Sequence, residues 1–196
     1  MTDPTLPLDA TGSSVQVTTA PSTAPSTELS TGPRTGMRQL YQEVILDHNR
    51  KPRNFGPLPG ANRHAEGDNP LCGDHIKLSV NVQNDEIESI GFEGEGCAIC
   101  KASSSMMTVA VKGKSVSDAD IMVEEFRGMA TGTLDPESTE HHLGRLKVFA
   151  GIKDLPSRVK CAILPWHALH AALHAEASIS TEGVADPVPG SMIGEE

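Results

Sequence analysis

Four side chains from separate parts of the sequence have the chemistry to hold one metal ion: Cys72, Asp74, Cys97 and Cys161. Cys72 and Asp74 form a Cys-x-Asp pair where a loop is expected to enter a strand. Cys97 comes directly before a predicted helix, and Cys161 lies at or near the start of the last one. Three thiolates and one carboxylate fill the four-coordinate shell of a zinc ion. Because a carboxylate holds zinc less firmly than a thiolate does, the set suits a site that must release a ligand.

Positive groups accompany these thiols in the sequence. Arg158 and Lys160 lie three residues and one residue before Cys161, the last of the four ligands. The helix predicted after Cys97 directs its N-terminal amides toward the site, and Gly96 allows backbone N–H groups to approach sulfur closely. A bound metal and these cations together would keep the sulfurs deprotonated near pH 7, which a sulfur nucleophile requires.

Simpler interpretations exist for the same residue types. A reduced cysteine often packs as a small buried apolar group, and this applies most directly to Cys100, an extra thiol that a four-ligand site does not need. A redox pair of Cys97 and Cys100 is disfavoured because no βαβ pattern surrounds it. His167, His170 and His174 share one face of the last predicted helix, and we interpret them as surface histidines of an amphipathic helix.

Short elements must position the four ligands. Strict alternation of Ile76, Leu78, Val80 and Val82 predicts a strand. A second strand is predicted at 86–95, where Ile87 is out of phase and indicates either a bulge or a later start of the strand. The segment from 51 to 74 is expected to be a long loop. The predicted helical segments are 37–50, 98–112, 116–130, 143–151 and 157–177. Strands that precede helices favour an α+β fold with a small antiparallel sheet and helices packed against it. Pro165 either kinks the last helix or begins a new one.

The ends of the chain differ in composition from this core. Residues 1–36 contain 19 Ser, Thr or Pro residues and almost no large apolar ones, which predicts a disordered leader. Residues 178–196 are expected to form a flexible acidic tail, leaving 37–177 as one domain. The formal net charge of −10, without a basic groove carrying interleaved aromatics, disfavours nucleic acid as a partner. With neither a signal peptide nor a membrane span predicted, we expect a cytoplasmic protein whose four cysteines stay reduced.

The core resembles the U-type iron–sulfur cluster assembly proteins (IscU/NifU-N-like), and most closely the SufU branch. Four separated stretches carry the resemblance: LYQEVILDHNRKPRNFG at 40–56, NPLCGDHIKL at 69–78, FEGEGCAICKASSSMMT at 92–108 and LPSRVKCAILPWHAL at 155–169. The scaffold branch carries His directly before its last cysteine, where this chain has Lys160. It is also shorter between the second and third cysteines, where this chain has 63 residues. Both differences point to SufU.

The resemblance implies the SufE/NifU-like α+β fold and assigns metal ligation to Cys72, Asp74, Cys97 and Cys161. In the SufU branch these residues bind zinc, and persulfide sulfur from a SufS-like cysteine desulfurase passes to Cys72 after a ligand exchange on zinc. Arg158 falls where the family keeps an arginine near the site. The resemblance thus implies a sulfurtransferase-like partner of a desulfurase that serves other Suf-type proteins and apo iron–sulfur proteins.

Two other functions remain open at the level of the sequence. One is a scaffold on which a [2Fe–2S] cluster forms before transfer to apo-proteins, with iron or a cluster in place of zinc. The other is a purely structural metal in a binding module. The family pattern has Ser where this chain has Cys100, so a shell made only of thiolates is an alternative to ligation by Asp74.

Overall fold

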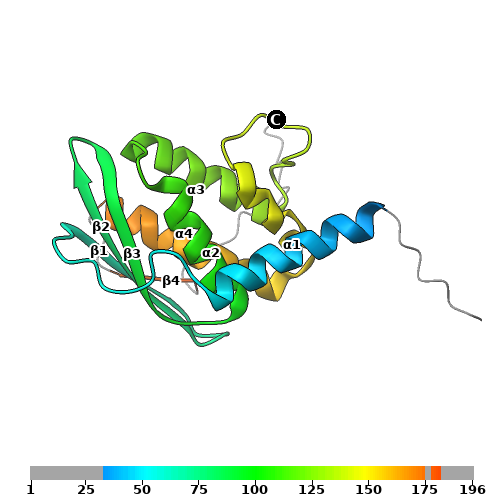
Figure 1. Cartoon of the computed structure of the whole chain (residues 1–196), viewed down its shortest axis with the longest axis horizontal. Coiled ribbons are helices and arrows are strands. Elements are labelled where there is room, and N and C mark those ends of the chain that lie inside the picture. Colours follow the sequence, from blue (N-terminus) through cyan, green and yellow to red (C-terminus); the bar gives the residue numbers. More distant parts are fainter. Residues whose placement is uncertain (1–32, 175–177, 182–196) are drawn as a thin grey trace, which may run out of the picture. The chain divides into compact units, whose positions relative to one another are not determined.

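The computed structural model describes residues 33–174 and 178–181, with side chains described for 42–174, 180 and 181. Figure 1 shows the elements in the order in which they follow one another. They are α1 (Pro33–Arg50), β1 (Arg63–Asn69), β2 (Asp74–Gln83), β3 (Glu86–Glu95), α2 (Ala98–Val111), α3 (Val116–Thr131), the 3-10 segment η1 (Gly144–Asp154), α4 (Pro156–Leu173) and β4 (Ser178–Ser180).

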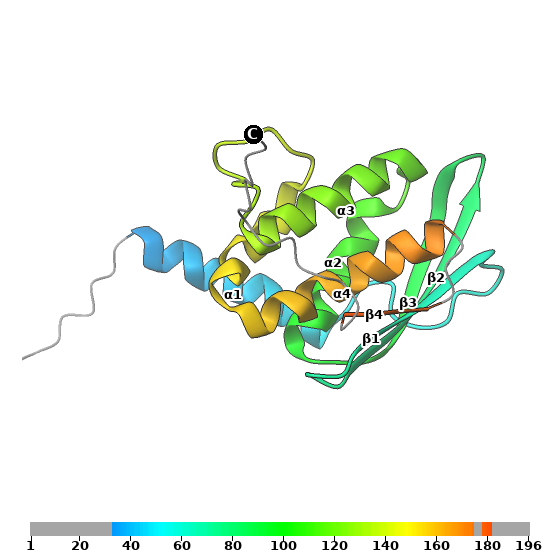
Figure 2. The same ribbon diagram turned by 180° about the vertical axis from the view of Figure 1, so that it is seen from behind.

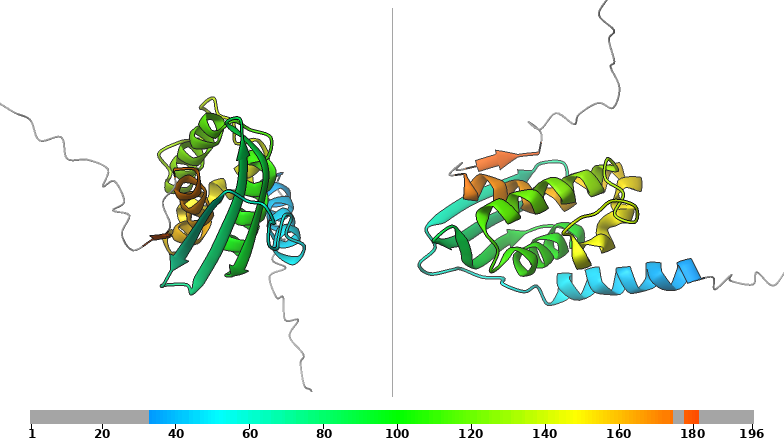
Figure 3. Two further views of the ribbon diagram at one scale, coloured as in Figure 1. Left: turned by 90° about the vertical axis from the view of Figure 1, so that its left-hand side faces the viewer. Right: turned by 90° about the horizontal axis from the view of Figure 1, so that it is seen from above.

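The sheet has the strand order β3-β2-β1-β4. Its first three strands are antiparallel, and β4 adds a short parallel edge beside β1. Helices α2 and α4 pack directly against the sheet, and the helices gather on one of its faces (Figure 3). The predicted α+β fold with a small antiparallel sheet is therefore confirmed.

Three boundaries differ from the sequence predictions. Helix α1 begins at Pro33, within the segment that we assigned to the leader, and residues 1–32 lie outside the described part. Ser178–Ser180 open the predicted tail but form β4, whose backbone pairs with β1 from Glu66 to Asp68. Helix α4 ends at Leu173, and 175–177 and 182–196 lie outside the described part.

Strand β1 was wrongly predicted as loop. Its inward positions are Ala65, Gly67 and Asn69, so alternation is present in the burial but not in the hydrophobicity of the sequence. Small residues are needed at these positions of β1 because helix α4 packs closely on the strand. A Cβ built on Gly67 would lie 3.0 Å from the Leu164 side chain of α4, which therefore packs almost directly on the strand backbone.

Of the two alternatives for Ile87, the structure has the bulge, because β3 already begins at Glu86. Asn81 of β2 pairs with Ser89, whereas the next residue, Val82, pairs with Ile87. One extra residue in β3 therefore moves Ile87 back to the inner face, where it is fully buried together with Ile90.

Helix α4 forms the centre of the core and continues through Pro165, which settles the alternative left open by the sequence. It lies beside α3 and β1 when viewed from behind (Figure 2). The Trp166 ring stacks on Phe126 of α3 with centroids 4.5 Å apart, and its Nε1 donates to Ser103 Oγ of α2 at 3.2 Å. Within the described segments, every helix lacks the combined length and apolarity needed to cross a bilayer.

Candidate metal centre

The ends of three elements bring the predicted ligands together. Cys72 lies in the turn between β1 and β2, Asp74 is the first residue of β2, and Cys97 is the N-cap of α2. Cys161 lies early in α4. Gly73 has a φ of 66°, a left-handed conformation that glycine adopts without strain, and it connects the first two of these residues.

Three of the four ligand atoms form a tight group. The Sγ atoms of Cys72 and Cys161 lie 3.0 Å apart, and these two atoms and a carboxylate oxygen of Asp74 all lie within 4.8 Å of one another. Both thiols are free. Cys97 joins the group through the carboxylate, because its Sγ lies 3.7 Å from Asp74 Oδ2.

Asp74 has a structural role in addition to its position among the thiols. Its side chain is almost completely buried, and Oδ1 accepts a hydrogen bond of 2.6 Å from the backbone N–H of Cys97. One carboxylate thus joins the start of β2 to the start of α2. The approach is possible because residue 96 is glycine: a Cβ there would lie 3.1 Å from Asp74 Oδ1.

The centre is rich in negative charge. Burial, the hydrogen bonds to Cys72 and Asp74, and the nearby charges of Cys97 and Asp74 raise the pKa of the Cys161 thiol. A cation placed among these groups would reverse that effect and favour the thiolates.

Arg158 is the predicted supporting residue that faces the thiols. Its hydrogen bond to Cys161, followed by the charges of Cys97, Cys161 and Cys72, raises the pKa of the guanidinium. Arg158 is exposed, so this positive charge next to the Cys161 thiol is accessible to solvent. Lys160 is half-buried on the same helix.

Cys100 lies behind the centre rather than in it. Its side chain is fully buried, and it is absent from the group of close ligand atoms found among the described residues. Burial, and then the charges of Asp74 and Cys97, raise the pKa of its thiol. Its backbone N–H lies 3.5 Å from Cys97 Sγ, which caps the helix. These features match a packed cysteine.

Asn69 contacts the centre and was missed by the sequence analysis. Its side chain is buried, and Nδ2 donates to the Sγ of Cys161 at 3.5 Å. Thr181 Oγ1, beyond β4, donates in turn to Asn69 Oδ1 at 3.3 Å. An amide directly before Pro70, three residues from a ligand, was the available signal, but β1 had to be recognised before its inward direction could be inferred.

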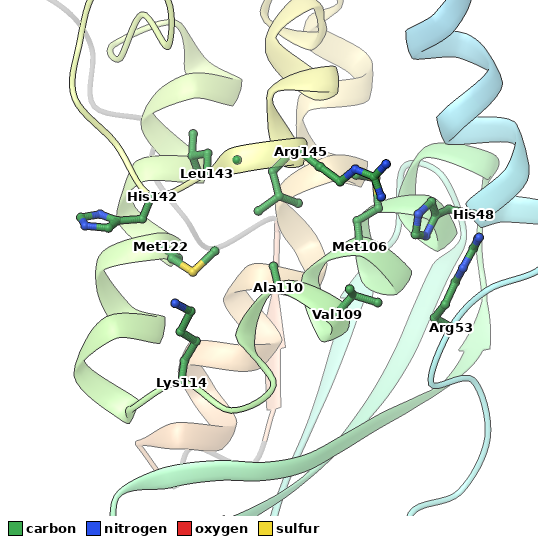
Figure 4. Close-up of a pocket in the computed structure, with 12 residues that line it drawn as sticks. His48, Arg53, Met106, Val109, Ala110, Lys114, Met122, His142, Leu143 and Arg145 are labelled. Atoms are coloured by element: carbon green, nitrogen blue, oxygen red, sulfur yellow. The ribbon is translucent and has the colours of Figure 1, made fainter.

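A cavity of the described part lies away from the thiols. It has a volume of about 360 Å³ and lies among α1, α2, α3 and η1. Its apolar floor includes Met106 and Met122, while His48, Arg53, Lys114, His142 and Arg145 surround it, with the guanidinium of Arg145 directed toward His48 (Figure 4). No cysteine lines this cavity, so it is separate from the metal centre.

Comparison with known proteins identifies the class to which this fold and site belong. The chain belongs to the family of the NifU-like N-terminal domain, whose model matches residues 40–176. The resemblance inferred from the four sequence stretches is therefore confirmed.

Some relatives are named as scaffold proteins and another is named as a sulfurtransferase. The chain is 41% identical over 142 residues to the iron–sulfur cluster assembly scaffold protein IscU of Streptococcus pyogenes serotype M1, covering 72% of this chain and 87% of the relative. It is also 41% identical over 137 residues to the zinc-dependent sulfurtransferase SufU of Bacillus subtilis strain 168, covering 70% and 91%.

A solved structure is also similar to this chain. The crystal structure of a proposed iron–sulfur cluster assembly scaffold protein for the SUF system of Fervidobacterium islandicum AW-1 is similar, with a TM-score of 0.64 and 34% identity. The similarity covers 69% of this chain and 98% of that one.

Proposed function

We propose that this chain is an iron–sulfur cluster assembly protein that accepts persulfide sulfur from a cysteine desulfurase at Cys72, beside a zinc ion held by Cys72, Asp74, Cys97 and Cys161. The observation that carries the proposal is the grouping of two thiols and a buried carboxylate, with a third thiol on the same carboxylate. The relative that is named a zinc-dependent sulfurtransferase supports it.

The donor set suits zinc in type and in number. With zinc–sulfur bonds of about 2.3 Å, two thiolates of a tetrahedral shell lie about 3.8 Å apart. The Sγ atoms of Cys72 and Cys161, at 3.0 Å, would move apart by less than about 1 Å, which side-chain rotation allows. Bound zinc would keep the thiolates anionic and protect them from oxidation.

Cys72 is the best placed nucleophile of the four thiols. Cys100 and Cys161 are buried, whereas Cys72 and Cys97 are both partly exposed. Cys97 is the N-cap of α2 and its Sγ accepts from the Cys100 N–H, whereas Cys72 lies on the turn before β2. In the transfer, the Cys72 thiolate attacks the outer sulfur of the desulfurase persulfide. A new sulfur–sulfur bond forms on Cys72 as the old one breaks, and the desulfurase cysteine leaves as a thiolate. No external oxidant or reductant is needed.

The surface around Cys72 suits contact with such a partner. Leu71 and Leu155 are 71% and 54% exposed. They flank the centre, since Cys72 Sγ lies 3.9 Å from the carbonyl oxygen of Ser157. Arg158 adds a positive charge that would stabilise the anionic persulfide near the attacking thiol.

The test mixes the purified full chain with a cysteine desulfurase and cysteine, and follows alanine release. We expect turnover to rise with the wild-type chain and with Cys100→Ser, and to show no rise with Cys72→Ala. Intact mass should find one added sulfur atom on the wild-type chain and on Cys100→Ser, and none on Cys72→Ala. A rise that survives Cys72→Ala, or the absence of any rise, would overturn the proposal.

A scaffold function is the second candidate, favoured by the relatives named as scaffolds. Three thiolates and a carboxylate can also ligate a [2Fe–2S] cluster as cargo. Anaerobic reconstitution with iron and sulfide separates the two functions. Under the scaffold function the chain takes up a cluster that persists longer in Asp74→Ala, whereas under sulfur transfer the zinc-loaded protein takes up none.

A further inference from the structure

Helix α4 carries a second set of metal-binding groups at the end opposite to Cys161. His170 lies in the last turn of α4, His174 is the C-cap residue directly after the helix, and Asp120 approaches them from α3. We propose that these three side chains bind a divalent first-row transition-metal ion, as a site separate from the thiolate centre.

The geometry of the three groups is already close to that of a ligand set. One ligand atom from each lies within 4.8 Å of the other two. The His174 Nε2 atom lies 3.0 Å from Asp120 Oδ2 and 3.1 Å from Oδ1. The rings of His170 and His174 are 4.4 Å apart between centroids. Zinc–nitrogen bonds of about 2.1 Å need ligand atoms about 3.4 Å apart, so rotation about side-chain torsions completes the site.

The packing of α3 against α4 fixes the positions of the two histidines and the aspartate. Histidines at i and i+4 lie on one face of a helix, the spacing used by helical zinc sites. The stacked rings of Phe126 and Trp166 lie between α3 and α4 and hold the two helices at a fixed separation. The site is also open to solvent, since the side chains of His174 and Asp120 are 43% and 31% exposed.

The donor types select the class of ion. Two imidazoles and one carboxylate suit iron(II), zinc and their neighbours, and imidazole disfavours magnesium and calcium. Three protein ligands leave further coordination positions open. Helical zinc hydrolases place a glutamate base directly after the first histidine, whereas here that position is the buried Ala171. The site therefore binds an ion without the base that metal-assisted hydrolysis requires.

The two centres on α4 are independent. At 1.5 Å of rise per residue, Cys161 and His174 lie about 20 Å apart along the helix axis. The second centre also lacks thiolate ligands. Metal binding at the two places can therefore be measured separately in the same full-length protein.

The experiment uses tag-free full-length protein that already holds zinc at the thiolates. Titration with Co²⁺ should show a second bound equivalent with weak visible bands and no new sulfur-to-metal charge-transfer band. Zn²⁺, and Fe²⁺ under anaerobic conditions, should bind at the same place, whereas Mg²⁺ and Ca²⁺ should not compete.

Two ligand variants and one control variant test which residues hold the ion. His174→Ala and the isosteric Asp120→Asn should each weaken binding of the second equivalent about tenfold or more. His64→Gln changes an exposed histidine on β1 and should leave binding unchanged. Asp120→Asn retains the side-chain shape, and a melting curve checks that each variant is folded. A single bound equivalent in the wild-type protein, or a second one that survives both ligand variants, would overturn the proposal.

Discussion

The backbone N–H of Cys97 donates a hydrogen bond of 2.6 Å to the buried carboxylate of Asp74, so one side chain both orders the start of α2 and lies among the thiols proposed to bind metal. Replacing Asp74 therefore has two separable consequences. Asp74→Ala removes a proposed zinc ligand and also leaves the Cys97 N–H without its acceptor. Asp74→Asn retains an oxygen acceptor but lacks the negative charge.

We expect Asp74→Ala to destabilise the metal-free protein by about 1–3 kcal/mol, the cost of an unsatisfied buried donor. Asp74→Asn should cost less in the metal-free protein, while both variants should bind zinc more weakly than the wild type. Chemical denaturation after chelation measures the first effect, and competition with a chromogenic chelator measures the second. Equal stability of all three metal-free proteins would show that the hydrogen bond contributes nothing to the fold.

The close approach of Cys72 and Cys161 predicts how the metal-free protein oxidises. Their sulfurs are 3.0 Å apart, and a disulfide needs about 2.05 Å. After zinc is removed, mild oxidation should join this pair, with a loss of two hydrogens by intact mass and a cross-linked peptide in a digest. The zinc-loaded protein should resist. Cys100→Ser serves as the control and should oxidise like the wild type, whereas a Cys97–Cys100 cross-link in the wild type would contradict the prediction.

Gly96 is predicted to be essential for the metal centre. A Cβ there would lie 3.1 Å from Asp74 Oδ1 and 3.3 Å from the Sγ of Cys100, so the carboxylate has to shift. Gly96→Ala should weaken zinc binding about tenfold, as expected when a ligand loses its supported position. Gly151→Ala is the matched control, because a Cβ at Gly151 would meet nothing within 4 Å. Equal zinc affinity of the two variants would mean that the centre tolerates the added methyl group.

The sequence was a better guide to the residues that meet at the metal centre than to the strands of the sheet. Cysteine and aspartate were visible as metal-binding chemistry, and glycine and turn residues marked the ends of the elements that carry them. Strand β1 was invisible because its inward positions are Ala65, Gly67 and Asn69, so burial alternates without a hydrophobic period. Missing that strand also concealed the inward direction of Asn69.

The histidines of α4 show a different limit of sequence analysis. Their spacing on one helix face was evident, and without a third partner they were interpreted as surface residues. Asp120 belongs to α3, whose packing against α4 is a tertiary relationship with no periodic signal. Only the structure brings the carboxylate beside His174.

The exposed side chain of Leu71 is expected to lie in the contact with a desulfurase. It is 71% exposed and directly precedes Cys72, so a partner that delivers sulfur to that thiol would cover it. Leu71→Asp should raise the concentration of the chain needed for half-maximal stimulation of desulfurase turnover, because it places a charge in an apolar contact. Zinc content and the maximal stimulation should stay near wild type, since the side chain makes no bond to the metal.

The control is Ile121→Asp. It replaces an apolar side chain of the same size as leucine, 46% exposed on α3, with the same charged residue. It should leave the concentration dependence unchanged, because the partner is expected to cover the turn that carries Cys72 rather than α3. Titrating each variant against a fixed amount of desulfurase separates the outcomes. If Leu71→Asp and Ile121→Asp behave alike, the partner does not contact the turn at Cys72. If Leu71→Asp lowers only the maximal rate, the leucine acts on the chemistry of Cys72 rather than on docking.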